Sequence, residues 1–98
     1  MLEIIYTHVT RRSYLIITLE PLSDTLSCVA GDQWSRERNK SFWRREARAY
    51  TYAANPGVYI AANFRRQCED MSIRVPASAW AAAEQALDAH GERYYRAQ

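Results

Sequence analysis

The segment that decides the fold is Trp34–Ala54, with the sequence WSRERNKSFWRREARAYTYAA. It is long, strongly charged and poor in helix breakers, so it predicts an α-helix that begins at Gln33 or Trp34. With successive residues placed about 100° apart, four arginines fall within an arc of about 120° and apolar residues lie opposite. The arginines are Arg38, Arg44, Arg45 and Arg48, and the opposite face holds Phe42, Trp43, Ala47, Ala49 and Tyr50. The alternative is a strand over Ala47–Ala53, because Arg48, Tyr50 and Tyr52 alternate with small residues.

The same region dominates the charge distribution. Residues 34–66 hold eight basic and two acidic side chains, a local net charge of +6, whereas residues 1–33 and 67–98 each sum to −2. The total of +2 therefore conceals a strongly polarised chain. Charge blocks of this kind bear on the choice of partner and not on the fold.

Length and composition predict one folded domain spanning residues 1–98. Hydrophobic residues make up 48% of the chain, with only three glycines and three prolines, which is far from disordered compositions. No apolar run approaches the roughly 18 residues that cross a bilayer, and the first residues do not resemble a secretory signal, so we expect a cytoplasmic protein without membrane contact. Cys28 and Cys68 lack metal-ligand spacing and are expected to be buried free thiols, and no cofactor is expected.

The N-terminal residues predict a β-hairpin. Leu2–Val9 and Ser13–Leu19 are rich in β-branched and aromatic residues and are separated by the polar triplet at residues 10–12. Leu26–Ala30 predicts a third strand that ends at Gly31-Asp32, with a capped helical turn as the alternative.

A second central helix is predicted to start at Asn55-Pro56, where asparagine suits the N-cap and proline the first helical position. Its apolar stripe consists of Ile60, Phe64, Cys68 and Met71. A hairpin with its turn at residues 55–57 remains the alternative.

Ser72–Val75 predicts a short strand, and Pro76 opens a last helix that runs to His90 and is stopped by Gly91. The inner stripe of this helix is Trp80, Ala83 and Leu87. The piece Met71–Gly91 resembles the ribbon and first helix of a ribbon-helix-helix DNA-binding protein. That family needs a second helix, for which only seven residues remain, so no DNA-contacting position is carried over.

Together these segments predict an α+β fold. An N-terminal antiparallel β-hairpin or meander is followed by two central helices, a short strand and a C-terminal helix.

The predicted function is non-catalytic binding of nucleic acid, or of a protein or nucleoprotein complex with an acidic surface, by a monomer or homodimer. Arginine pairs with phosphate, and aromatic rings stack on exposed bases. A solvated helix face with salt bridges from Glu37 and Glu46 would explain the charges, but two acids cannot balance six cations. The predicted partner-binding residues are Trp34, Arg36, Arg38, Lys40, Trp43, Arg44, Arg45, Arg48, Arg65 and Arg66.

Two alternatives belong to other functional classes. Small size and a surface rich in arginine and aromatic residues also suit an inhibitor, encoded by a phage or mobile element, that binds a host defence complex, as anti-CRISPR proteins do. A small metal-independent RNase toxin would use His8 and His90, although a surface histidine near a turn and a histidine at a helix C-terminus explain both. No motif for a catalytic nucleophile or a phosphate loop is present, so the chain is not expected to be an enzyme.

Overall fold

Four antiparallel strands come first along the chain and pair in sequence order. The computed structural model describes residues 2–36, 41–52 and 57–97; at residues 34–36, 41–44, 52, 57–59 and 92–97 it describes the backbone alone. The strands are β1 (Glu3–Val9), β2 (Ser13–Glu20), β3 (Thr25–Arg36) and β4 (Ser41–Tyr52), in the order β1-β2-β3-β4. The predicted N-terminal hairpin is confirmed, and the third strand is longer than Leu26–Ala30 because it continues through Gly31-Asp32.

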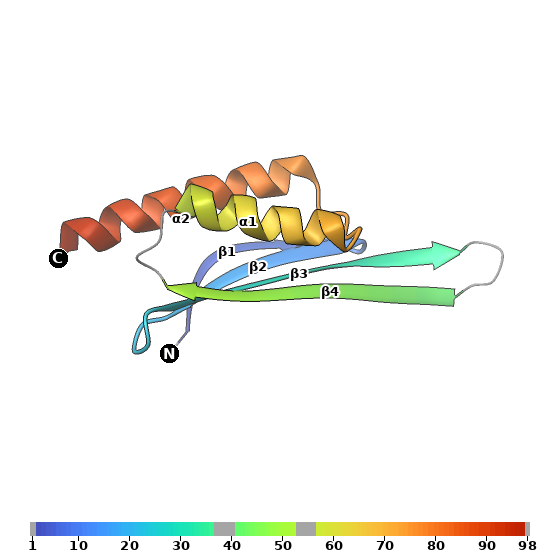
Figure 1. Ribbon diagram of the computed structural model, residues 1–98, viewed down its shortest axis with the longest axis horizontal. Coiled ribbons are helices and arrows are strands. Elements are labelled where there is room, and N and C mark those ends of the chain that lie inside the picture. Colours follow the sequence, from blue (N-terminus) through green and yellow to red (C-terminus); the bar gives the residue numbers. More distant parts are fainter. Residues whose placement is uncertain (1, 37–40, 53–56, 98) are drawn as a thin grey trace.

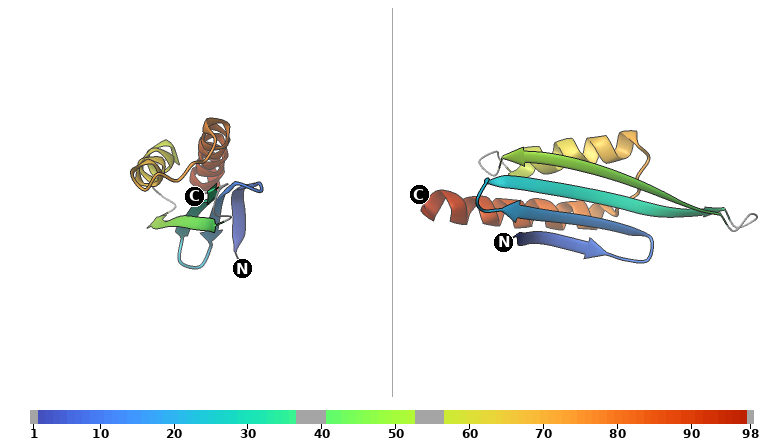
Figure 2. Two further views of the ribbon diagram at one scale, coloured as in Figure 1. Left: turned by 90° about the vertical axis from the view of Figure 1, so that its right-hand side faces the viewer. Right: turned by 90° about the horizontal axis from the view of Figure 1, so that it is seen from below.

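Two helices follow the strands and lie on the same face of the sheet (Figure 1). They are α1 (Gly57–Asp70) and α2 (Ala77–Ala97), which pack against each other, with α1 next to β4 and α2 next to β1. Seen from below, the sheet lies in front of both helices and presents the face that neither helix covers, which we call the uncovered face (Figure 2). The predicted sequence of two central helices, a short strand and a C-terminal helix is therefore wrong.

The predicted helix over residues 34–54 is replaced by the second half of β3 and by β4. The two strands pair without a break from Thr25 opposite Tyr52 to Arg36 opposite Ser41. The reason lies in the two-residue period of this segment: Ala47 is buried and Ala49 half-buried, while Arg48 and Tyr50 between and after them are exposed. The alternative prediction of a strand over Ala47–Ala53 agrees better with the structure than the helix does, because β4 runs from Ser41 to Tyr52. The alternative hairpin turn at residues 55–57 is wrong, because α1 follows β4.

One hydrophobic core joins the sheet to the helices and makes the chain a small α+β domain. Burial alternates strictly along β2, so that Leu15, Ile17 and Leu19 face the helices. The predicted stripes Ile60, Phe64, Cys68 and Trp80, Ala83, Leu87 are buried against them. Phe64 and Trp80 meet edge to face with ring centroids 5.9 Å apart, which joins α1 to α2.

Residues 72–75, which connect the two helices, are not a strand. Their backbone instead closes the end of α1, with Ser72 in the left-handed region at φ 59° and its N–H bonded to the Glu69 carbonyl. Met71 is exposed and leaves the apolar stripe. The resemblance to the ribbon-helix-helix family thus fails at its ribbon. Gly91 does not end α2, because no glycine has a positive φ and the helix continues to Ala97.

Candidate functional site

The ends of β3 and β4 form a two-stranded ribbon that projects beyond both helices (Figure 1). We call residues 33–36 and 41–44 the β3–β4 ribbon; it makes the molecule elongated, with extents of 55 × 25 × 20 Å. In its register Trp34 lies opposite Trp43, and Gln33 lies opposite Arg44. The basic segment predicted from the sequence thus stays together in space, but on a ribbon and not on one face of a helix.

The ten predicted binding residues separate into four groups. Trp34, Arg36, Trp43 and Arg44 belong to the ribbon, where the backbone alone is described, and Arg38 and Lys40 lie outside the described residues. Arg45 and Arg48 lie on β4 next to the ribbon, whereas Arg65 and Arg66 are on α1. The Arg65 guanidinium donates to Glu69 at 3.0 Å, so part of the positive charge of α1 is neutralised locally.

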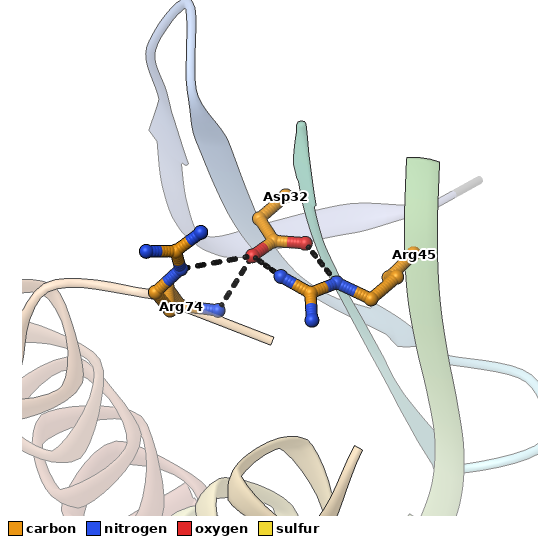
Figure 3. Close-up of polar contacts among 3 residues, drawn as sticks. All are labelled: Asp32, Arg45 and Arg74. Carbon is orange, nitrogen blue, oxygen red and sulfur yellow. Dashed lines mark hydrogen bonds and ion pairs between the residues drawn. The ribbon is translucent and has the colours of Figure 1, made fainter. Parts of the chain in front are cut away.

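A buried carboxylate organises the base of the ribbon (Figure 3). Asp32 is only 3% exposed. It accepts two hydrogen bonds from Arg45, from Nε at 3.0 Å and Nη2 at 2.7 Å, and a third from the Arg74 backbone N–H at 2.9 Å. The carboxylate therefore joins β3, β4 and the connection between the helices at one point. A fork of this kind fixes the plane of the Arg45 guanidinium.

An open cleft lies beside this carboxylate. Its volume is about 480 Å³, and it is lined by Arg45, Glu69, Ser72, Ile73 and Arg74. The Arg74 side chain is 71% exposed, and its Nε lies 3.9 Å from Asp32 Oδ2, at the outer limit of an ion pair. Most of its donors are therefore not engaged by Asp32.

Three arginines that the sequence analysis placed in the acidic ends of the chain also reach the ribbon base. Arg74 does so through its bond to Asp32. Arg11 and Arg12 are exposed on the connection between β1 and β2, which is held next to Asp32 because the Gln33 N–H donates to the Arg12 carbonyl at 2.8 Å. No local charge pattern could have revealed this grouping, since it depends on pairing between distant segments.

Arg48 belongs to the opposite, uncovered face of the sheet. Its Nε donates to Glu46 at 2.7 Å, and the Tyr14 hydroxyl donates to the other oxygen of the same carboxylate. The hydrogen bond from Tyr14, followed by that from Arg48, lowers the pKa of Glu46. The Glu46 carboxylate in turn raises the pKa of Arg48. The charge of Arg48 is thus partly balanced by Glu46. Because Arg45 and Arg48 are three residues apart on β4, their side chains lie on opposite faces of the sheet.

The uncovered face also carries exposed apolar side chains. Ile4, Val9 and Tyr50 have exposed fractions of 66%, 69% and 67%. Half-buried Ile16 and Val29 pair between them at the centre of the face. This face combines exposed aliphatic and aromatic side chains with the Glu46–Arg48 pair, a mixture that suits a protein contact surface.

His8 and His90, the two residues considered for RNase chemistry, lie on different elements. His90 is buried in α2, and His8 on β1 approaches Ser13 Oγ at 3.5 Å. Cys28 and Cys68 are free and buried, as predicted. Within the described residues, no three His, Cys, Asp or Glu side chains gather as metal ligands do.

Comparison with protein-family models, with curated proteins and with solved structures finds no match to this chain. Over the described residues, neither helix combines the length and apolarity needed to cross a lipid bilayer. The ribbon, its base and the uncovered face of the sheet are therefore the features of the molecule that bear on its function.

Proposed function

We propose that this protein is a non-catalytic nucleic-acid-binding domain whose β3–β4 ribbon enters a groove of a duplex. The observation that supports this is the projection of an antiparallel two-stranded ribbon carrying Arg36 and Arg44 beyond the helices. The major groove of B-DNA is about 12 Å wide and admits a two-stranded ribbon. Several DNA-binding proteins read sequence with strands in this way.

Charge at the same end of the molecule supports the proposal. Arg11, Arg12 and Arg74 add to the ribbon arginines, while two acids at the ribbon base are paired, Asp32 with Arg45 and Glu46 with Arg48. Exposed arginines flanking a ribbon suit the phosphates on either side of a groove.

The test compares two double variants with equal loss of charge. Arg36→Ala/Arg44→Ala removes two ribbon cations, and Arg93→Ala/Arg96→Ala removes two from the far end of α2. Arg45 is left intact because it holds Asp32. Fluorescence anisotropy with labelled duplex and single-stranded oligonucleotides is measured over a range of salt concentrations.

Each neutralised phosphate contributes about 0.9 to the slope of log affinity against log salt concentration on duplex DNA, and about 0.7 on a single strand. We expect the ribbon variant to lose about two units of slope on duplex, and the control variant to match wild type. If wild type does not bind duplex at low salt, the proposal is wrong, even where it binds single strand.

A second candidate is binding to a protein, as expected for an anti-CRISPR-like inhibitor. The uncovered sheet face, with exposed Ile4, Val9 and Tyr50, favours it. In that case a partner captured from a bacterial lysate resists nuclease treatment and moderate salt, and Tyr50→Ala removes it while Arg36→Ala/Arg44→Ala does not. The opposite pattern supports the nucleic-acid proposal.

A further inference from the structure

The cleft at the ribbon base contains N–H donors of Arg45 that its pair with Asp32 does not use. Arg45 uses Nε and one hydrogen of Nη2 for Asp32, which leaves three of its five N–H donors for other partners. Its side chain is 32% exposed and lines the cleft. Because Asp32 already fixes the guanidinium, a ligand bound there would order no further side-chain torsion in Arg45.

Arg74 differs from Arg45 because its backbone, and not its side chain, is held by Asp32. Its backbone N–H is anchored by Asp32 at 2.9 Å, whereas its guanidinium is exposed and reaches Asp32 Oδ2 only at 3.9 Å. Figure 3 shows the guanidinium groups of Arg74 and Arg45 on opposite sides of the carboxylate. Both approach the single oxygen Oδ2, and both residues line the same cleft.

The charge around the cleft favours an anion. Glu69, the acid in its lining, is paired with Arg65, and Asp32 is paired with Arg45, so the charge of Arg74 is in excess. Exposed Arg11 and Arg12 stand on the neighbouring connection, whose backbone bonds to Gln33.

We propose that this cleft is a phosphate seat, in which Arg45 and Arg74 together bind one backbone phosphate of the nucleic acid whose groove holds the ribbon. The seat rests on the proposed function, because a ribbon inserted in a groove brings its base against the strand that borders the groove. It fixes how deeply the ribbon enters, and it reads no sequence. Asp32 is a positioning residue here, since it acts through Arg45.

The test uses Arg74→Ala, which keeps the backbone N–H bonded to Asp32 and removes only an exposed side chain. Arg93→Ala, in the last turns of α2, is the control of equal charge. Salt dependence is measured by anisotropy on two duplexes of unrelated sequence, together with the urea midpoint of each variant. We expect Arg74→Ala to lower the salt slope by about one unit and to weaken both duplexes by the same factor, with an unchanged urea midpoint.

The two proposals fail in different ways. If wild type binds duplex but Arg74→Ala keeps the slope of Arg93→Ala, the phosphate seat is wrong and the ribbon proposal stands. If wild type binds no nucleic acid, the proposed function itself is wrong. A lower urea midpoint with an unchanged slope would also reject the seat, because Arg74 would then serve only the fold.

A second arm separates backbone phosphate from a small free anion. The Arg45 Nε–H, protected by Asp32, serves as an NMR probe, and inorganic phosphate is titrated against chloride at equal ionic strength. A shift that depends on Arg74 and also appears with duplex supports the seat. A shift with inorganic phosphate that duplex does not reproduce identifies a small-anion site and overturns the proposal.

Discussion

The two faces of the sheet differ less in their residues than in what covers them. Ile16 and Ile17 are neighbours of the same type on β2, yet Ile17 is buried under the helices while Ile16 is half-buried on the uncovered face. The same contrast separates Cys28 from Val29 on β3. Apolar, β-branched residues therefore determine that a segment is a strand, whereas helices from elsewhere in the chain determine which face becomes core.

Truncation of a core aromatic residue should show the largest difference between the faces. Phe64→Ala removes a ring from the covered face and its contact with Trp80, and we expect a loss of about 3–5 kcal/mol in the free energy of unfolding. Tyr50→Ala, on the uncovered face, should cost about 0.5 kcal/mol or less. Urea denaturation followed by tryptophan fluorescence measures both. Equal losses would show that the uncovered face is also part of the core.

The two carboxylates paired with arginines provide the next contrast. Asp32→Asn leaves a fixed arginine without its buried counter-charge, and we expect it to cost about 2–4 kcal/mol. Glu46→Gln breaks the exposed pair with Arg48 and should leave the urea midpoint nearly unchanged, because solvent screens that pair. A stable Asp32→Asn protein would mean that the ribbon base is held by other contacts.

Two glycines should respond to alanine in opposite directions. A Cβ at Gly31 would clash with the Tyr14 ring and lie 2.7 Å from the Arg45 carbonyl oxygen, so Gly31→Ala should destabilise by about 1–3 kcal/mol. A Cβ at Gly91 meets nothing within 4 Å inside α2, so Gly91→Ala should stabilise by about 0.5–1 kcal/mol. Thermal unfolding of the two variants distinguishes them. Adding Tyr14→Ala to Gly31→Ala tests whether the ring is the obstacle.

Thiol reactivity gives the smallest and most local contrast. Burial raises the pKa of Cys28 from 9.0 to about 12 and that of Cys68 to about 11. An acid whose pKa is raised by folding stabilises the fold fully below its unfolded pKa, and this contribution is lost as the pH rises toward the folded values. Ellman's reagent at pH 8 should therefore react slowly with the folded protein and rapidly in urea. Tyr50→Cys supplies a reactive thiol on the uncovered face as the control.

The sequence predicted the parts of the fold that depend on local pattern. The N-terminal hairpin and the stripes through Phe64 and Trp80 follow from spacing within one segment, and the buried thiols follow from the general tendency of cysteine to be buried. The error at residues 34–54 arose because a charged segment without glycine or proline satisfies both helical and two-residue periods, and only pairing with β3 decides between them. The prediction that the last helix is stopped by Gly91 was wrong because a glycine ends a helix in this way only where its φ is positive, and that of Gly91 is not.

The candidate site was predicted only in part for the same reason. The basic segment could be found by counting charges, but its division between a ribbon, a buried ion pair and the uncovered face could not. Arg74 is the clearest omission: it stands in a stretch of net negative charge, and only its bond to Asp32 brings it to the ribbon. That hydrogen bond joins two residues that are 42 positions apart in the sequence.

The strand-first order of the chain has a consequence during biosynthesis. All four strands leave the ribosome before α1, and each can pair at once with the strand that preceded it. Until the helices emerge, Leu15, Ile17 and Leu26 lie on a bare apolar surface that is later sealed. We expect the nascent sheet to be the species most prone to aggregation and most dependent on chaperones, and synthesis of α2 to be the step that ends this exposure.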